Sequence, residues 1–200
     1  MSDAPSEARD RREAAIRWLS RLLFAEPEAG GLSPGERAEL RRADPRDALT
    51  PVMWRLLTAP AIATATGSSR MEQEAAERAW ALLIRTMVEA GTSEEARPVG
   101  QVLADPHGTR EPGAAYGEVR FLRLLRARGL EETAHHAGQA ARWCAVQGAA
   151  IRFTDRHGAD GFGGFLLAAA LRRDAAEHRA HAIARDYFRN LPRDAGAPES

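Results

Sequence analysis

The sequence of 200 residues predicts an all-α fold, a compact bundle of about eight or nine helices. Apolar residues recur at a helical spacing of three and four positions in every periodic segment. Several of these segments begin at recognisable helix caps. The run Ile151-Arg152-Phe153 is too short to indicate a sheet. We therefore expect helices throughout.

The N-terminal half shows three helical segments before a weak one. Residues 5–25 carry an apolar stripe that contains Ala15, Ile16, Leu19, Leu22 and Leu23. Ser33, followed by Pro34 and Glu36, is typical of a capping box that starts a short helix ending before Asp44-Pro45. Thr50-Pro51 starts another short helix through Leu57. Thr58–Ser69 is proline-interrupted and indicates a loop or a weak helix.

The clearest helix runs from a Ser69–Glu72 capping box to Gly91. Its apolar stripe consists of Ala76, Trp80, Leu83, Ile84 and Met87. Glu74 and Arg78, and likewise Arg85 and Glu89, are spaced to form ion pairs along its other side.

Glycine and proline between Asp105 and Gly113 mark the boundary between two helical lobes, residues 1–108 and 109–194. The lobes are expected to pack as one unit, and residues 195–200 to form a disordered tail.

The C-terminal half is also helical. Glu131–Gln147 carries a stripe of small residues that predicts a close helix–helix contact: Thr133, Ala137, Ala140, Ala141 and Cys144. The glycines of Gly158–Gly164 indicate a flexible connection. Phe165–Arg173 and Ala175–Leu191 are the last two predicted helices, and Ala176, Ala180, Ile183, Tyr187 and Leu191 are expected to face inward.

Charge and cysteine content limit the class of protein. The 28 basic residues, all arginine, balance 28 acidic ones, so nucleic-acid binding would require segregation of charge on the surface. A single cysteine, Cys144, excludes an intramolecular disulfide and fits a reducing cytoplasm. The N-terminus does not resemble a signal peptide, and no apolar run is long enough to span a membrane. We expect a cytoplasmic protein without a membrane partner.

No residue pattern predicts catalysis, a metal site or a cofactor. His135 and His136 are adjacent and point about 100° apart on a helix, which is poor geometry for chelation. His178 and His181 lie one turn apart without a recognisable third ligand. Cys144 lies on the small-residue stripe and is expected to be a buried, unreactive thiol.

The arginine clusters are the strongest functional signal. Between Val119 and Arg128, Phe121, Leu122, Leu124 and Leu125 share one helix face, whereas Arg120, Arg123 and Arg126 project from the other. Arginines about one turn apart suit a phosphate backbone, although a solvated helix face is the alternative. Arg41-Arg42 and Arg172-Arg173 are expected at helix ends, where the helix dipole also favours cations, and Arg185 and Arg189 share an outer face.

The order of these motifs resembles that of the small, CasB-type subunit of the type I-E CRISPR Cascade interference complex. The likeness extends from about Glu36 to Leu191 and is carried by six segments: Ala38–Ala43, Trp54–Leu57, Val99–Leu103, Glu118–Ala127, Phe165–Arg173 and Ala184–Phe188. Within it, the helix over Glu131–Gln147 departs from the family's leucine- and arginine-rich character and keeps only Arg142.

The resemblance implies a non-enzymatic all-helical subunit that stabilises the displaced non-target strand and the guide–target hybrid. Its partners would be the other Cascade subunits, crRNA, target and non-target DNA, and a second copy of itself. Its backbone-contacting residues would be Arg41, Arg42, Arg120, Arg123, Arg126, Arg172 and Arg173, and we add Arg142 and Arg185 as further nucleic-acid-binding candidates. Two alternatives remain open: a transcription regulator with a helix-turn-helix in Leu32–Leu57, and a structural adaptor without nucleic-acid contacts.

Overall fold

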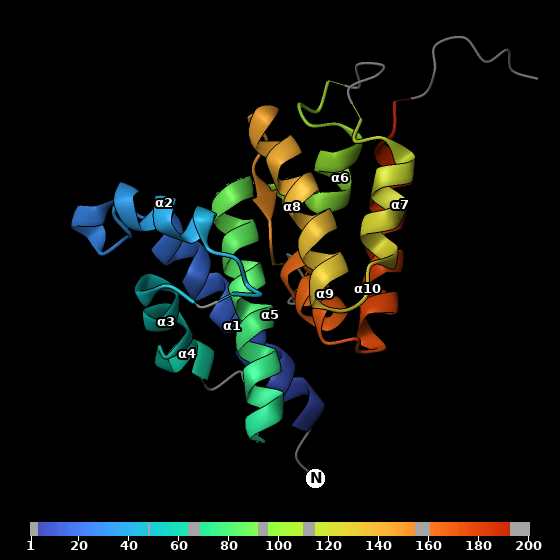
Figure 1. Ribbon diagram of the computed structural model, residues 1–200. Coiled ribbons are helices and arrows are strands. Elements are labelled where there is room, and N and C mark those ends of the chain that lie inside the picture. Colours follow the sequence, from blue (N-terminus) through green and yellow to red (C-terminus); the bar gives the residue numbers. More distant parts are fainter. Residues whose placement is uncertain are drawn as a thin grey trace, which may run out of the picture.

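The computed structural model describes residues 4–47, 49–63, 69–91, 96–109, 115–154 and 161–192, and it confirms the all-α prediction. Figure 1 shows the described residues as a bundle in which α5 separates the N-terminal helices from α6–α10. Ten α-helices are present in this part of the chain. The expected tail at residues 195–200, and the loop at 110–114, lie outside it.

The N-terminal half comprises α1 (Ala4–Phe24), a 3-10 turn (Pro27–Ala29), α2 (Pro34–Arg42), α3 (Pro51–Leu57), α4 (Pro60–Ala63) and α5 (Arg70–Ala90). The C-terminal half comprises β1 (Arg97–Pro98), α6 (Val99–Ala104), α7 (Glu118–Arg126), α8 (Leu130–Val146), β2 (Ile151–Arg152), α9 (Gly161–Ala170) and α10 (Ala175–Asn190). The two strands form a short parallel pair, in which Arg97 pairs with Ile151. The sequence did not predict this pair because each strand has only two residues.

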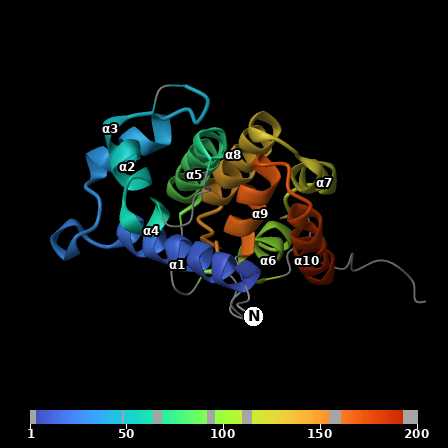
Figure 2. The same cartoon turned by 90° about the horizontal axis from the view of Figure 1, so that it is seen from below.

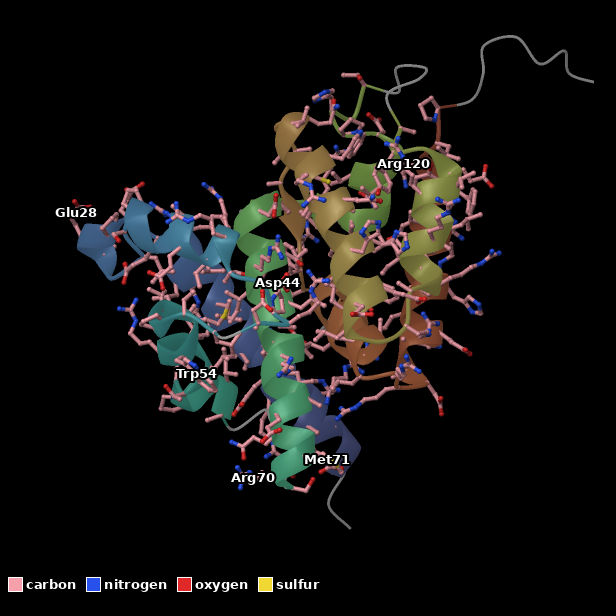
Figure 3. All side chains as sticks on the ribbon, viewed as in Figure 1. Glu28, Asp44, Trp54, Arg70, Met71 and Arg120 are labelled. Atoms are coloured by element: carbon pink, nitrogen blue, oxygen red, sulfur yellow. The ribbon has the colours of Figure 1, made fainter. Side chains whose placement is uncertain are left out.

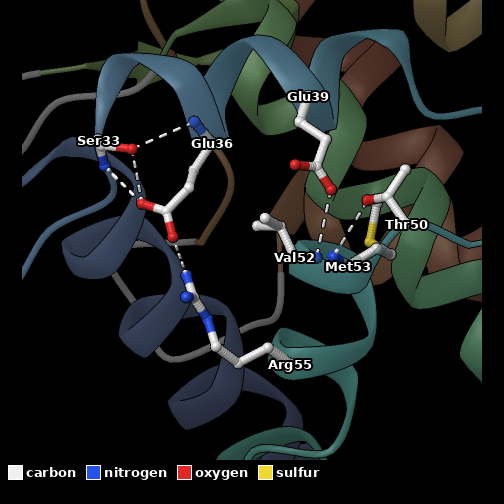
Figure 4. Close-up of polar contacts among 7 residues, drawn as sticks. All are labelled: Ser33, Glu36, Glu39, Thr50, Val52, Met53 and Arg55. Atoms are coloured by element: carbon white, nitrogen blue, oxygen red, sulfur yellow. Dashed lines mark hydrogen bonds and ion pairs between the residues drawn. The ribbon is translucent and has the colours of Figure 1, made fainter.

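Both predicted capping boxes are present. At α2, the backbone N–H of Glu36 donates to the Ser33 hydroxyl (3.2 Å), and the Ser33 N–H donates to the Glu36 carboxylate (2.8 Å), as Figure 4 shows. Arg55 donates to the same carboxylate at 2.5 Å and so links α3 to α2. The backbone hydrogen bond from Ser33 and the side-chain bond from Arg55 lower the pKa of Glu36 to about 2. A matching box of Ser69 and Glu72 starts α5.

The core lies around α5 and is continuous across both halves of the chain. All residues of its predicted stripe are buried, and α5 contacts α1, α2, α3, α8 and α9. The small-residue stripe of α8 is also buried, because α8 packs closely against α5 and α9. Figure 2 shows α1 crossing one side of the bundle, in contact with α4, α5 and α9.

Three local predictions are wrong. Gly161–Gly164 belong to α9 and are not a flexible connection, because α9 packs tightly: a Cβ at Gly163 would lie 2.8 Å from Ile16 Cδ1. Helix α9 ends at Ala170, so Arg172-Arg173 lie beyond it rather than in its last turn. The ion pairs of α5 also differ, since Glu74 pairs with Arg70 and Glu89 with Arg142.

Candidate nucleic-acid interface

Helix α7 presents its arginines to solvent as predicted. Arg120, Arg123 and Arg126 are exposed, whereas Phe121, Leu124 and Leu125 are buried; Leu122 is half-buried. A step of three residues rotates a helical side chain by about 300°, so the arginines drift by about 60° each around the helix. They therefore do not form a straight row. Arg120 and Arg123 lie on the side next to α8.

Contacts across the α7–α8 boundary define the neighbours of these two arginines. Burial lowers the pKa of His136, and the nearby charges of His135 and Arg123 lower it further. Burial likewise raises the pKa of Tyr116, whereas the positive charges of Arg120 and Arg142 oppose that shift. Arg123 thus lies within electrostatic range of His136, and Arg120 and Arg142 lie within that of Tyr116.

Helix α8 contributes Arg142, one of the further candidates from the sequence. Its guanidinium is half-exposed and lies 3.9 Å from the Glu89 carboxylate of α5, a weak surface pair that leaves donors directed to solvent. We call the surface formed by Arg120, Arg123, His135, His136 and Arg142 the α7–α8 face. Because its pKa is lowered, His136 adds less positive charge to this face than an ordinary histidine would.

The face continues across α5 to α2. Arg41 Nε donates to the carbonyl oxygen of Val88 (3.3 Å), the residue before the Glu89 that pairs with Arg142. Two predicted arginines from opposite halves of the chain thus flank the last turn of α5. Figures 1 and 3 show α2, α5, α8 and α7 side by side on the near side of the molecule, with Arg120 on α7.

Acidic residues limit the positive area at the opposite end of α8. Asp44, labelled in Figure 3, accepts hydrogen bonds from Arg46, which lower its pKa to about 2. Glu131 is also close enough to influence Arg46. The charge of Arg46 is therefore largely balanced within the protein, and Arg46 adds little to the α7–α8 face.

The remaining predicted arginines do not join this face as one set. Arg42 is exposed at the end of α2, and Arg185 is exposed on α10. Arg172 lies beside Gly129 in the α7–α8 turn, where its Nε is 2.9 Å from the position a Cβ would take. Arg173 instead lines a cavity with Arg12 and Arg179. Sequence reasoning missed Arg12 and Arg179 because no local spacing connects α1 with α10.

The histidines of α8 and α10 are half-buried or exposed, whereas Cys144 is buried. The rings of His135 and His136 are edge-to-face with centroids 4.9 Å apart, and His178 and His181 are exposed. Within the described ranges, no group of three or more His, Cys, Asp or Glu residues is arranged to hold a metal ion. Cys144 is fully buried, which raises its pKa to about 12 and keeps the thiol protonated at neutral pH. No helix in this part of the chain is long and apolar enough to cross a membrane.

The protein is all-helical, and Arg120, Arg123 and Arg142 lie on its α7–α8 face. Comparison with protein-family models, curated proteins and solved structures found no match for the chain. What the face binds must therefore be inferred from its own residues.

Proposed function

We propose that this protein is a non-catalytic subunit that binds the nucleic-acid backbone without reading its sequence. The observation that carries the proposal is the convergence of Arg120, Arg123 and Arg142 from two helices on the α7–α8 face. Permanently charged guanidinium groups form bidentate hydrogen bonds with phosphate oxygens. Such contacts position a strand but carry no base information.

The zero net charge of the chain supports a role in an assembly rather than as an independent DNA-binding protein. A protein of balanced charge lacks the overall attraction that drives tight non-specific binding. A local arginine face is useful when another component brings the nucleic acid close. In a guide-RNA complex, base pairing reads the sequence and the protein needs to hold only the backbone.

From the resemblance to the CasB-type family, we further propose that the assembly is a cytoplasmic type I-E Cascade. The other Cascade subunits, crRNA, target and non-target DNA, and a second copy of the chain would then be its partners. Arg41 would extend the contact surface beyond the α7–α8 face, and Arg126 and Arg172 would meet the strand near the other end of α7.

The structure of Leu32–Leu57 gives little support to the helix-turn-helix alternative. The second helix of this segment, α3, has seven residues, of which Val52, Met53, Leu56 and Leu57 are buried. A recognition helix must present several side chains to base edges in the major groove. Helix α3 leaves Trp54 and Arg55 exposed on its outer side, together with Pro51 at its start.

Binding to four DNA ligands tests these classes. We would measure the fluorescence anisotropy of two unrelated single-stranded oligonucleotides and of two duplexes of unrelated sequence at several salt concentrations. The proposal predicts similar, strongly salt-dependent affinities for the two single strands. A marked preference for one duplex sequence would instead support a regulator. Salt-insensitive or undetectable binding at low salt would support the structural adaptor.

A further inference from the structure

Three arginines that are far apart in sequence line one cavity on the α1 side of the bundle. Arg12 comes from α1, Arg173 from the turn after α9, and Arg179 from α10. The cavity has a volume of about 70 Å³, and the other described residues that line it are uncharged: Trp80, Gly164, Leu167, Ala168, Leu171 and Ala175. Each charged residue in this lining is therefore an arginine.

The turn after α9 places Arg173 at the cavity. The Arg173 N–H donates to the Ala168 carbonyl oxygen (2.8 Å), and the Arg172 N–H donates to that of Ala169 (3.1 Å). This is the Schellman pattern of a helix C-terminus, in which the residue after the C-cap adopts left-handed backbone geometry. Glycine usually occupies that position, but here it is Arg172, with φ of 53°.

The left-handed residue separates two adjacent guanidinium groups. Arg172 lies against Gly129 at the α7–α8 turn, whereas Arg173 lines the cavity. A strained backbone conformation persists when the surrounding structure requires it, and such residues cluster at functional sites. Arg172 stands where glycine is favoured, which is consistent with a role for its side chain at the α7–α8 turn and for that of Arg173 at the cavity.

The third wall comes from the start of α10. Arg179 Nη1 donates to the carbonyl oxygen of Ala175, one turn earlier (3.0 Å), which holds its guanidinium near the first turn of this 16-residue helix. The N-terminal end of a helix carries a partial positive charge. Glu177 lies in the first turn of α10 and offsets part of that charge, so the three arginines are the main source of positive charge at the cavity.

Cavity size restricts the ligand. A volume of about 70 Å³ exceeds the roughly 10–15 Å³ that a cavity needs to hold one water, but it falls well below the roughly 300–1,000 Å³ that is typical of small-molecule sites. The apolar floor of Trp80, Leu167 and Leu171 excludes water from one side and strengthens electrostatic interactions with the arginines. A compact, strongly charged oxyanion fits these properties better than a base or a sugar.

We propose that this cavity binds a single phosphate group through Arg12, Arg173 and Arg179, independently of the α7–α8 face. This phosphate is the terminal phosphate of an oligonucleotide, a phosphate of its backbone, or a free phosphate ion. The arginines would recognise all three through the same charged hydrogen bonds. If the phosphate belongs to an oligonucleotide, the cavity is a second contact to the strand, and it is more confined than the α7–α8 face.

Thermal unfolding in inorganic phosphate, against chloride at equal ionic strength, tests the site directly. A ligand that binds the folded state raises the midpoint as its concentration increases. We expect this rise in the wild type and in Arg189→Gln, which removes an exposed arginine of α10 that does not line the cavity. Arg12→Gln and Arg173→Gln should each weaken phosphate affinity about tenfold, equivalent to roughly 1.4 kcal/mol. A variant with Arg120, Arg123 and Arg142 all changed to glutamine should keep the phosphate response.

The source of the phosphate is identified with the variant in which Arg120, Arg123 and Arg142 are changed to glutamine. We would compare its affinity for short single-stranded oligonucleotides that carry a 5′-phosphate or a 5′-hydroxyl. Tighter binding of the phosphorylated strand, lost on adding Arg173→Gln, would assign a terminal phosphate. Equal binding of the two strands, weakened by Arg173→Gln, would assign a backbone phosphate. Binding of inorganic phosphate without either effect would assign a free anion.

Two results would overturn the proposal. One is a wild-type midpoint that responds equally to phosphate and chloride. The other is a phosphate response that Arg12→Gln and Arg173→Gln leave intact, or that Arg189→Gln removes to the same extent. Because the response is measured without nucleic acid, failure of this site leaves the proposed role of the α7–α8 face untouched.

Discussion

The phenolic hydroxyl of Tyr187 donates a 2.7 Å hydrogen bond to the backbone carbonyl oxygen of Tyr116, and both residues are buried. The same Tyr187 ring stacks on Phe121 of α7 with centroids 3.8 Å apart. Tyr116 precedes α7, so these contacts fix α7 on α10 and thereby orient the arginine-bearing side of α7 outward.

Tyr187→Phe should lower the free energy of unfolding by about 1–3 kcal/mol, because the buried Tyr116 carbonyl loses its donor. Tyr116→Phe is the matched control: its hydroxyl is buried without a hydrogen-bond partner among the described residues. Removal of that hydroxyl should be neutral or stabilising. Urea unfolding compares the variants, and equal losses for the two would contradict the geometry.

Trp80→Ala should cost about 3–5 kcal/mol as a large-to-small change in the core. Trp80 is 2% exposed, whereas Trp54, labelled in Figure 3, is 44% exposed and serves as the comparison. Trp54→Ala should cost much less. A loss below roughly 1 kcal/mol for Trp80→Ala in chemical denaturation would mean that the α5 stripe faces solvent.

Arg172→Gly should stabilise the fold by about 1 kcal/mol, because it removes the penalty of a side chain in the left-handed region. Arg173→Gly, at the next position, is the control and should not stabilise. Calorimetric midpoints of the two variants provide the measurement. A fall in the midpoint of Arg172→Gly would show that contacts of the arginine side chain outweigh the backbone penalty.

Alkaline stability should depend on Cys144. Burial raises its pKa to about 12 from an ordinary value of 9.0, so between these values only the unfolded state loses the proton. The stabilisation is complete below pH 9 and declines as pH rises toward 12, by about 1.4 kcal/mol per pH unit. Cys144→Ala should reduce the slope of unfolding free energy against pH in this range. An unchanged slope would mean that the thiol is not buried.

The helices were predictable wherever their signals were local. Ser33 and Ser69 mark the starts of α2 and α5, and the spacing of small residues up to Cys144 predicts the buried side of α8. Gly163 misled the prediction because its low helix propensity suggests a loop, whereas close packing against Ile16 favours a residue without a side chain.

The candidate sites were less predictable than the helices. Periodicity shows which side of α7 is exposed, but not that Arg142 and Arg41 meet at the last turn of α5. The contact between Arg172 and Gly129 likewise depends on how α9 packs beside the α7–α8 turn. These relationships are tertiary, and a single sequence carries no local signal for them.

The central claim is that Arg120, Arg123 and Arg142 hold nucleic-acid phosphates, and the salt dependence of binding tests it most directly. The variant with all three changed to glutamine is compared with a control that loses three exposed arginines elsewhere, Arg21, Arg70 and Arg189. Both variants change the net charge equally, and thermal unfolding verifies that each is folded.

We measure affinity for a single-stranded oligonucleotide across a salt series. The slope of log affinity against log salt should decrease in magnitude by roughly 0.7 for each phosphate contact removed, or about 2 for the triple variant, and remain unchanged in the control. An unchanged slope in the folded triple variant, or equal changes in both variants, would contradict the claim and leave the α7–α8 face as a solvated surface.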